Sequence, residues 1–317
     1  MTSNDPSATS ERLVLTFSQL QLQEALRAAG FTPVPWPDDE AARLRLLELA
    51  PRIEAVVAIG PKPLPEGFME AATRLGLIAC VGAGYENYDP VALKARGVRL
   101  TNAGGVNAED VADLAIGLYI AAQRRIVEAD GWVKAGRWGQ PVMSHRIRGR
   151  RLGVVGLGAI GEAVAVRGAA MGMEVAWWGP RPKPSAWTRL DDPMALAQWA
   201  DVLAVCCRPT PENEGLVGAA MLDALGPSGV LVNVSRGSLV NEPDLIAALR
   251  EGRIAAAALD VFAEEPTDHR QWADVPNLTL HPHSGGATYE SIADGRKLVV
   301  ENVRRHYAGE PLLSAVN

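Results

Sequence analysis

The sequence lacks the features that mark membrane, secreted and nucleic-acid-binding proteins. Its 317 residues carry a net charge of −6, so the chain as a whole does not attract phosphate backbones or anionic lipid. No apolar run approaches the roughly 18 residues that a membrane-spanning helix needs. The first residues, MTSNDPSATSER, show no basic start followed by an apolar stretch, so we expect no secretory signal. These absences predict a soluble protein that binds neither nucleic acid nor membrane.

Cysteine is also scarce. The three cysteines are Cys80, Cys206 and Cys207, an odd number that does not suggest a disulfide framework. The last two are adjacent in an apolar run, where we expect them to be small core residues. The H-P-H spacing of His281 and His283 lacks a supporting cluster of Cys, Asp or Glu, so we expect no metal site. We expect the protein in a reducing cytoplasm.

Short apolar runs alternate with amphipathic stretches along most of the chain. The first series contains LVLTF, EAVVAIG and LIACVGAG, with helix-like stretches between them. A second series, from Arg151 onward, contains RLGVVGLG, MEVAWWG, DVLAVCC, GVLVNVS, IAAAALDVF and NLTLHPH. Strands that alternate with helices are typical of βαβ units and parallel sheets. The sequence therefore predicts an α/β protein with two separate doubly wound units.

Two long helical stretches flank the second series. Residues 109–136 include VADLAIGLYIAA, which is apolar on more than one face and must be covered by the core or by another subunit. Residues 287–309 are mixed in polarity, and we expect this helix to fold back on the first unit.

A glycine-rich turn follows the first strand of the second series. The motif G-L-G-A-I-G lies between the apolar RLGVV and a helix, the context in which it binds a dinucleotide. Gly156 allows the tight turn, Gly158 lets the backbone approach a pyrophosphate, and Gly161 permits close helix–strand packing. The alternative is a βα turn without ligand, but the strand–turn–helix setting favours cofactor binding. The residues assigned to this site are Gly156, Leu157, Gly158, Ala159, Ile160 and Gly161.

The end of the next strand bears on the choice of cofactor. An NAD-binding protein has an acidic residue roughly 20 residues after the glycine motif, where it accepts hydrogen bonds from the ribose. Here MEVAWW is followed by Gly179, Pro180 and Arg181, with Lys183 close behind. Glycine makes space for a 2'-phosphate and a guanidinium pairs with it, so the sequence favours NADP over NAD. The alternative is a solvated basic loop beside either cofactor.

Ionisable residues end three later strands. Arg236 follows LVNVS, Asp260 and Glu265 lie in ALDVFAEEP, and His283 lies in HPHSGG. Ligands of open parallel sheets bind beyond the carboxyl ends of the strands, so these side chains are expected to converge on the cofactor.

This set suits the reduction of a 2-oxo acid. Histidine is a proton donor with a pKa near operating pH, a paired glutamate stabilises the imidazolium, and arginine binds a carboxylate through its planar donor fork. Taken singly, Arg236 could cap a turn, Glu265 could be a solvated acid, and His283 could be a loop histidine. Their joint placement on successive strand ends favours the catalytic interpretation. The other histidines, including His281, are expected to be structural or exposed.

The chain resembles the D-isomer-specific 2-hydroxyacid dehydrogenases over nearly its whole length. The matching segments are VGAGYENYD, TNAGGVNAEDVADLAIGL, GVVGLGAIG, NVSRGSLVNEPDLIAAL, ALDVFAEEP and HPHSGGAT. The resemblance implies a flavodoxin-like substrate domain formed by residues 1–102 and 288–317. It implies a Rossmann NAD(P)-binding domain, residues 103–287, inserted in it, with the active site in the cleft between the domains.

The resemblance also implies roles for the ionisable residues. Arg236 would bind the substrate carboxylate and carbonyl, His283 would be the acid/base, and Glu265 would pair with His283. Asp260 would hold the nicotinamide amide region of the cofactor.

Further implied contacts come from backbone and small side chains. Thr210 and Val234 would line the cofactor site. Backbone N–H groups of Gly82, Ala83 and Gly84 would receive the substrate carboxylate, although a simple glycine turn after a strand is the alternative for this loop.

Within the family, the VADLAIGL helix and the Gly-Pro-Arg loop resemble those of the NADPH-preferring reductases of glyoxylate, hydroxypyruvate and hydroxyphenylpyruvate. Arg208 and Pro209 depart from the Pro-Leu pair that usually precedes Thr210. The family also implies a homodimer with residues 109–136 in the interface and Trp138 close to the partner's active site.

We therefore expect NADPH-dependent reduction of small 2-oxo acids, such as glyoxylate and hydroxypyruvate, to D-2-hydroxy acids. The alternatives are a nucleotide-sensing, corepressor-like binding protein and a phenylpyruvate-type, phosphite or formate dehydrogenase on the same scaffold. A sensor would not need Arg236, Glu265 and His283 together. Pocket depth, set near Val81 and Tyr85, would decide how large an oxo acid is accepted.

Overall fold

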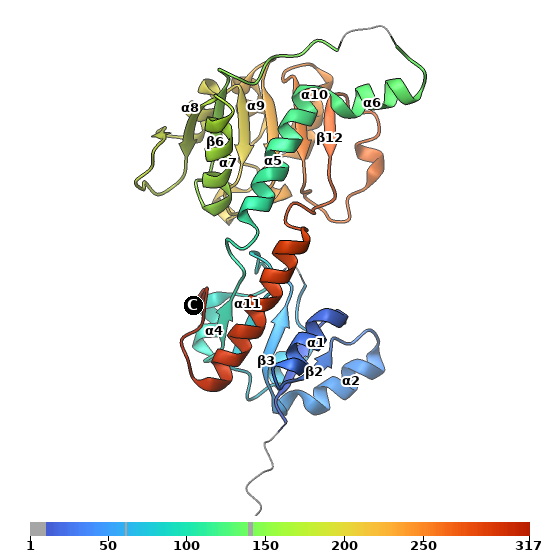
Figure 1. The fold of residues 1–317 in the computed structure, drawn as a ribbon, viewed down its shortest axis with the longest axis vertical. Helices are drawn as coiled ribbons and strands as arrows, with labels where there is room; N and C mark the ends of the chain where they lie inside the picture. The colour runs from blue at the N-terminus through green and yellow to red at the C-terminus, as the bar shows by residue number, and fades with distance from the viewer. Residues whose placement is uncertain (1–10, 61, 139–141) are drawn as a thin grey trace, which may run out of the picture. The chain divides into compact units, whose positions relative to one another are not determined.

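The computed structural model describes residues 11–60, 62–138 and 142–317. They form two compact units, Met1–Asn107 with Tyr289–Asn317 (unit 1) and Ala108–Thr288 (unit 2) (Figure 1). Each unit is an all-parallel sheet covered by helices on both faces, so the predicted α/β class with two doubly wound sheets is confirmed. The assignment of residues 1–102 with 288–317 to substrate and of 103–287 to nucleotide stays a prediction.

The sheet of unit 1 has the strand order β2-β1-β3-β4-β5. Its strands are β1 (Leu13–Thr16), β2 (Thr32–Pro35), β3 (Ile53–Ala58), β4 (Leu77–Cys80) and β5 (Arg99–Thr101). Helices α1 (Leu20–Ala28) and α11 (Tyr289–Ala308) cover one face, and α2 (Glu40–Leu49), α3 (Phe68–Ala71) and α4 (Pro90–Ala95) cover the other. Because both faces are covered, β1 and β4 are buried at every residue and carry continuous apolar runs rather than alternating ones.

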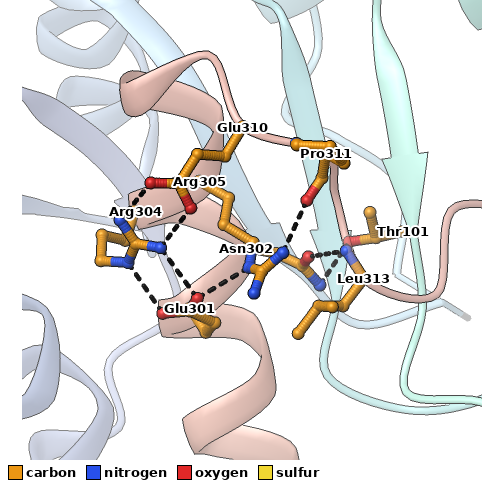
Figure 2. A network of polar contacts seen from close by, with 8 residues as sticks. All are labelled: Thr101, Glu301, Asn302, Arg304, Arg305, Glu310, Pro311 and Leu313. Atoms are coloured by element: carbon orange, nitrogen blue, oxygen red, sulfur yellow. Dashed lines mark hydrogen bonds and ion pairs between the residues drawn. The ribbon is translucent and has the colours of Figure 1, made fainter.

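The C-terminal helix belongs to unit 1, as expected, and packs against β4 and beside α1 (Figure 1). The segment after it is held by side chains of its last turns (Figure 2). Asn302, only 1% exposed, donates to Thr101 Oγ1 and accepts the backbone N–H of Leu313 at 2.7 Å. Arg304 and Arg305 both bind Glu301, and these ion pairs hold the pKa of Glu301 at about 2. The tail is thereby fixed along β5.

The sheet of unit 2 has the order β12-β11-β10-β9-β6-β7-β8. Its strands are β6 (Arg151–Val155), β7 (Glu174–Trp178), β8 (Thr188–Arg189), β9 (Val202–Val205), β10 (Val230–Asn233), β11 (Ala256–Leu259) and β12 (Leu278–Leu280). Helices α5 (Ala108–Gln123) and α7 (Ala159–Ala170) lie side by side over one face (Figure 1). Helices α8 (Pro193–Trp199), α9 (Ala219–Leu225) and α10 (Glu242–Arg250) cover the other.

Local sequence signals start several of these helices. Asp39, Asp89 and Asp192 accept backbone N–H groups at the starts of α2, α4 and α8, and Asn241 does the same for α10. Such caps satisfy donors that the first helical turn leaves open. A proline follows the capping residue directly in α4 and α8, and one residue later in α10. Proline is tolerated there because the first turn of a helix does not use its backbone N–H groups.

One helix prediction is wrong. The sequence suggested a single helical stretch over residues 109–136, but the structure has α5 and a separate α6 (Ile126–Lys134). The break occurs at Arg125, whose φ of 51° is left-handed and cannot continue a right-handed helix. No residue of α6 is buried.

Burial determines the protonation state of two of the three cysteines. Cys80 and Cys207 are buried and Cys206 is partly buried. Removal from water raises the pKa of Cys80 to about 12 and that of Cys207 to about 11, which keeps these thiols protonated and inert.

Candidate active site

The predicted site residues of unit 2 gather at one edge of its sheet. All strands of this sheet are parallel, so their carboxyl ends share that edge. Gly156 follows β6, Val234 follows β10, Asp260 follows β11 and His281 follows β12. This is the edge where ligands bind in doubly wound folds.

Two of the three glycines in the turn after β6 have no room for a side chain. Gly156 has φ 92°, and a Cβ there would lie 2.5 Å from the backbone of Cys207. A Cβ on Gly161 would lie 2.0 Å from the carbonyl oxygen of Gly156, so helix and turn are in direct contact.

Gly158 differs from the other two. It is the N-cap of α7, and a Cβ there would meet nothing within 4 Å. The space beside the helix N-terminus is open, as the approach of a pyrophosphate to backbone N–H groups requires. Leu157 is buried, and Ala159 and Ile160 form the first helical residues. The residues present therefore fit a dinucleotide phosphate.

The loop after β7 carries basic residues and no carboxylate. The carbonyl of Gly179 accepts a hydrogen bond from Arg189 at 2.9 Å, which fixes the start of the loop. Lys183 is paired with Glu162 of α7 at 3.1 Å. Arg181 follows Pro180, is exposed, and among the described residues makes neither a hydrogen bond nor an ion pair. Its guanidinium is available to a ligand.

Arg236 lies in a turn that is fixed by buried polar groups. Asn233, the fully buried last residue of β10, donates to the carbonyl of Arg236 at 2.9 Å and accepts the N–H of Ser235 at 3.1 Å. Gly237 packs directly on the backbone of Phe262, where a Cβ would lie 1.8 Å from a carbonyl carbon. Arg236 itself is partly exposed, so its guanidinium is presented from a rigid turn.

His283 and Glu265 form a close pair. His283 Nδ1 lies 2.6 Å from Glu265 Oε2, and both side chains are about one-third exposed. The other carboxylate oxygen of Glu265 accepts the backbone N–H of Phe262 at 2.9 Å. Because Nδ1 faces the carboxylate, Nε2 is left for a reacting partner. The pair combines a proton donor with a fixed anion.

The carboxylate of Asp260, after β11, is engaged by the loop after β12. Its carboxylate lies 2.6 Å from His281 Nδ1 and accepts the backbone N–H groups of Ser284 and Gly285 at 2.9 and 3.0 Å. Only 2% of Asp260 is exposed. The predicted contact of Asp260 with a nicotinamide amide stays a prediction.

The remaining predicted cofactor residues flank this edge. Val234 is 5% exposed directly after β10. Thr210 is exposed and starts the short helix η2 (Pro211–Asn213), with its backbone N–H donated to Asn213 Oδ1 at 2.7 Å. Arg208 is also exposed.

The predicted substrate loop lies in unit 1, after β4. The carbonyl of Gly82 accepts the N–H of Ala103 at 2.9 Å, and that of Ala83 accepts Asn102 Nδ2 at 2.7 Å. A Cβ on Gly60 would lie 2.1 Å from the carbonyl oxygen of Gly84, so two loops are in backbone contact. With its carbonyls engaged in this way, the loop is held in one shape.

Comparison with known proteins decides the family. The family model described as "D-isomer specific 2-hydroxyacid dehydrogenase, NAD binding domain" matches residues 116–285. The chain belongs to this family. It is an oxidoreductase, and the resemblance noted in its motifs is confirmed.

Named relatives and a solved structure agree with this membership. The chain is 38% identical over 270 residues to hydroxyphenylpyruvate reductase of Plectranthus scutellarioides, covering 84% of this chain and 86% of the relative. It is 37% identical to glyoxylate/hydroxypyruvate reductase A of Arabidopsis thaliana, covering 83% and 85%. The NADPH-dependent glyoxylate/hydroxypyruvate reductase of Sinorhizobium meliloti, solved with NADP and malonate, is 33% identical with a TM-score of 0.87, covering 97% of both chains.

Three supporting residues of this dehydrogenase were not among the predicted site residues. Asn233 and Asn102 orient the turns of Arg236 and Ala83, and His281 contacts Asp260. Asn233 is a polar residue that ends a buried apolar strand, which is the one signal the sequence offered. The other two depend on contacts between segments distant in the sequence.

The described residues form neither a metal-ligand cluster nor a membrane-spanning helix. Within residues 11–60, 62–138 and 142–317, no group of three or more His, Cys, Asp or Glu side chains is arranged to hold a metal ion. In the same part of the chain, no helix combines the length and apolar character that crossing a membrane requires.

Proposed function

We propose that this dehydrogenase reduces small 2-oxo acids to D-2-hydroxy acids with NADPH as its preferred cofactor. The observation that carries the proposal is the His283–Glu265 pair, at 2.6 Å, on the sheet edge that also holds the open glycine turn. A proton donor and a dinucleotide site on one edge are what reduction of a carbonyl needs.

In this proposal His283 is the acid. Its Nδ1 is directed to Glu265, so Nε2 donates the proton to the carbonyl oxygen as a hydride reaches the carbonyl carbon. Glu265 stabilises the imidazolium before the transfer and fixes the ring orientation throughout. In the oxidative direction His283 takes the proton back from the hydroxyl group.

Arg236 binds the substrate in this proposal. Its planar guanidinium pairs with the substrate carboxylate and polarises the carbonyl, which increases the electrophilic character of the carbonyl carbon. The buried Asn233 holds the turn of Arg236, so the cation is in place before the substrate arrives.

The cofactor would be held at the glycine turn. The backbone around Gly156 and Gly158 would bind the pyrophosphate at the N-terminus of α7, with Thr210 and Val234 beside it. When bound, the reduced nicotinamide supplies the hydride. Asp260 is proposed to contact its amide region, as the family resemblance implies.

The preference for NADPH rests on the loop after β7. Arg181 is exposed and has no partner among the described residues, and no acidic side chain ends β7 to repel a 2'-phosphate. The NADPH-dependent reductase of Sinorhizobium meliloti, solved with NADP, supports the same choice. In this proposal NAD is the weaker cofactor.

We also propose that the enzyme is a homodimer. Helix α6 has no buried residue, and its large apolar side chains Ile126, Val127 and Val133 are about half exposed. Trp138 is 88% and Met143 80% exposed, in the segments that follow α6. Several large apolar side chains exposed along one stretch of the chain indicate an interaction surface, and a second copy would cover it. Cytoplasmic location stays a prediction.

The test is a panel of initial rates. NADPH and NADH oxidation would be followed with glyoxylate, hydroxypyruvate and 4-hydroxyphenylpyruvate, the substrate classes that the relatives' names give. We expect turnover with a higher kcat/KM for NADPH than for NADH, and faster reduction of the two smaller acids. Binding of both cofactors without reduction of any oxo acid would favour the nucleotide-sensing alternative.

A further inference from the structure

A second imidazole–carboxylate pair joins the same two loops, after β11 and after β12, as the proposed catalytic pair. His281 Nδ1 and Asp260 Oδ1 are 2.6 Å apart, the same separation as His283 Nδ1 and Glu265 Oε2. The two pairs differ in burial, because the side chain of Asp260 is 3% exposed and that of Glu265 is 35% exposed. One pair is enough for the proton transfer, so the buried pair needs another explanation.

Asp260 is bonded to three consecutive residues of the turn that carries His283. Its backbone carbonyl accepts the N–H of His283 at 2.7 Å. Its carboxylate accepts the N–H of Ser284 at 2.9 Å and that of Gly285 at 3.0 Å. The path of residues 283–285 is therefore set by this one aspartate.

This turn depends on such support. His283 has φ 49°, a left-handed conformation that is unfavourable for a residue other than glycine. Strained backbone persists only where its surroundings fix it. Gly285 lies directly against the Asp260 carboxylate, since a Cβ there would lie 2.8 Å from Asp260 Oδ2. The Asp260 carboxylate thus supports the turn in which His283 adopts this conformation.

His281 supplies the side-chain donor to that carboxylate. A buried carboxylate keeps one orientation when donors engage both of its oxygens. Oδ1 of Asp260 contacts His281 Nδ1 and accepts the N–H of Ser284, and Oδ2 accepts the N–H of Gly285. His281 itself is only partly buried and borders an apolar cavity of about 380 Å³ that is also lined by His269.

We propose that His281 is a positioning residue of the reaction. By donating its Nδ1–H to Asp260, it fixes the carboxylate that holds residues 283–285, and so it holds the His283 imidazole against Glu265. The proposal rests on the acid role of His283 given above.

Three substitutions at this position separate the hydrogen bond from side-chain volume. His281→Asn keeps an amide N–H near the position of Nδ1, whereas His281→Gln places it near that of Nε2, away from Asp260. His281→Phe keeps the ring without a donor. His269→Phe is the matched control, because His269 borders the same cavity and its side chain is 91% exposed.

The first readout needs no turnover. In proton NMR spectra of the enzyme without cofactor, short imidazole–carboxylate hydrogen bonds give strongly deshielded Nδ1–H resonances, and His283→Ala assigns the one from His283. We expect His281→Phe and His281→Gln to shift or broaden the His283 resonance, and His281→Asn and His269→Phe to leave it unchanged. Thermal unfolding and NADPH titration show that each variant is folded.

The second readout is the rate. We expect kcat for hydroxypyruvate reduction to fall at least about tenfold in His281→Phe and His281→Gln, because misplacing a reacting group by about 1 Å can cost about a hundredfold. The Kd of NADPH should stay within about twofold, and His281→Asn should restore most of kcat. An unchanged kcat in folded His281→Phe and His281→Gln would overturn the positioning role. Normal turnover by His283→Ala would instead overturn the proposed function, so the two failures are distinct.

Discussion

The carboxyl edges of the two sheets are built alike but carry different groups. In unit 2 the strand ends lead to Arg236, Asp260, Glu265 and His283, whose side chains or turns are held by hydrogen bonds. In unit 1 the corresponding loop after β4 offers the glycine-rich backbone at Gly82. The same topology thus supplies ionisable side chains in one unit and backbone groups in the other. In the proposed function, proton transfer falls to unit 2, and carboxylate binding by the backbone of unit 1 stays a prediction.

The largest expected effect concerns a backbone contact in unit 2. Gly161→Ala would put a Cβ 2.0 Å from the carbonyl oxygen of Gly156, so the turn and helix α7 must separate. We expect the free energy of unfolding to fall by about 3 kcal/mol, as for severe overpacking. Denaturant unfolding would measure it. Gly158→Ala is the control, since its Cβ meets nothing within 4 Å; equal losses in both variants would contradict the packing argument.

Removal of the acid should nearly abolish turnover. We expect His283→Ala to lower kcat at least about a hundredfold, because general acid catalysis contributes that much or more. Its Kd for NADPH, measured by fluorescence titration, should stay close to the wild-type value. If kcat is retained, the proton comes from another group.

Selectivity for the cofactor should depend on the loop after β7. Arg181→Ala removes a charged hydrogen bond to the 2'-phosphate, worth about 1.5 to 3 kcal/mol, or about 10- to 150-fold in the Kd of NADPH. The Kd of NADH should change little. Lys183→Ala is a matched basic control, because Lys183 is already paired with Glu162. Equal weakening of both cofactors by Arg181→Ala would exclude a phosphate contact.

A substitution in unit 1 tests the other side of the comparison. Gly82→Ala adds a methyl group where nothing lies within 4 Å, so folding should be unaffected. If its backbone N–H receives the substrate carboxylate, the KM for hydroxypyruvate should rise about two- to tenfold, the cost of one disturbed hydrogen bond. The Kd of NADPH should not change. An unaltered KM would remove Gly82 from substrate binding.

The smallest effect is a pH dependence of unit 1. Hydrogen bonds from Arg304 and then Arg305 lower the pKa of Glu301 from 4.5 to about 2. A lowered folded-state pKa contributes stability that is complete above pH 4.5 and is lost as the pH falls toward about 2. Glu301→Gln should therefore lower the Tm near neutral pH and make little difference near pH 2. A Tm shift of equal size at both pH values would show that this ion-pair cluster does not contribute to stability.

Sequence patterns predicted the second unit better than the first. The strands at the core of unit 2 are continuous apolar runs, and the glycine motif marks the turn after β6 directly. In unit 1, β2 contains two prolines and β5 has only three residues, so neither strand shows a recognisable apolar run. The break at Arg125 was missed because a single left-handed residue leaves no periodic signal.

The candidate site shows a similar limit. Arg236, Glu265 and His283 were identifiable because each follows an apolar strand, and strand ends of a parallel sheet converge. The contact of His281 with Asp260 was not foreseen, since it joins residues 21 apart through a turn whose path the sequence does not reveal. Residue types at strand ends are visible in a sequence, whereas the hydrogen bonds that orient them are not.

One measurement tests the central claim most directly. Purified enzyme would be mixed with NADPH and hydroxypyruvate, whose reduction creates a stereocentre that the reduction of glyoxylate does not. The amount of NADPH oxidised would be compared with the amount and configuration of the hydroxy acid formed. The account predicts one equivalent of the D-isomer for each NADPH consumed. NADPH binding without oxidation, or formation of the L-isomer, would contradict it.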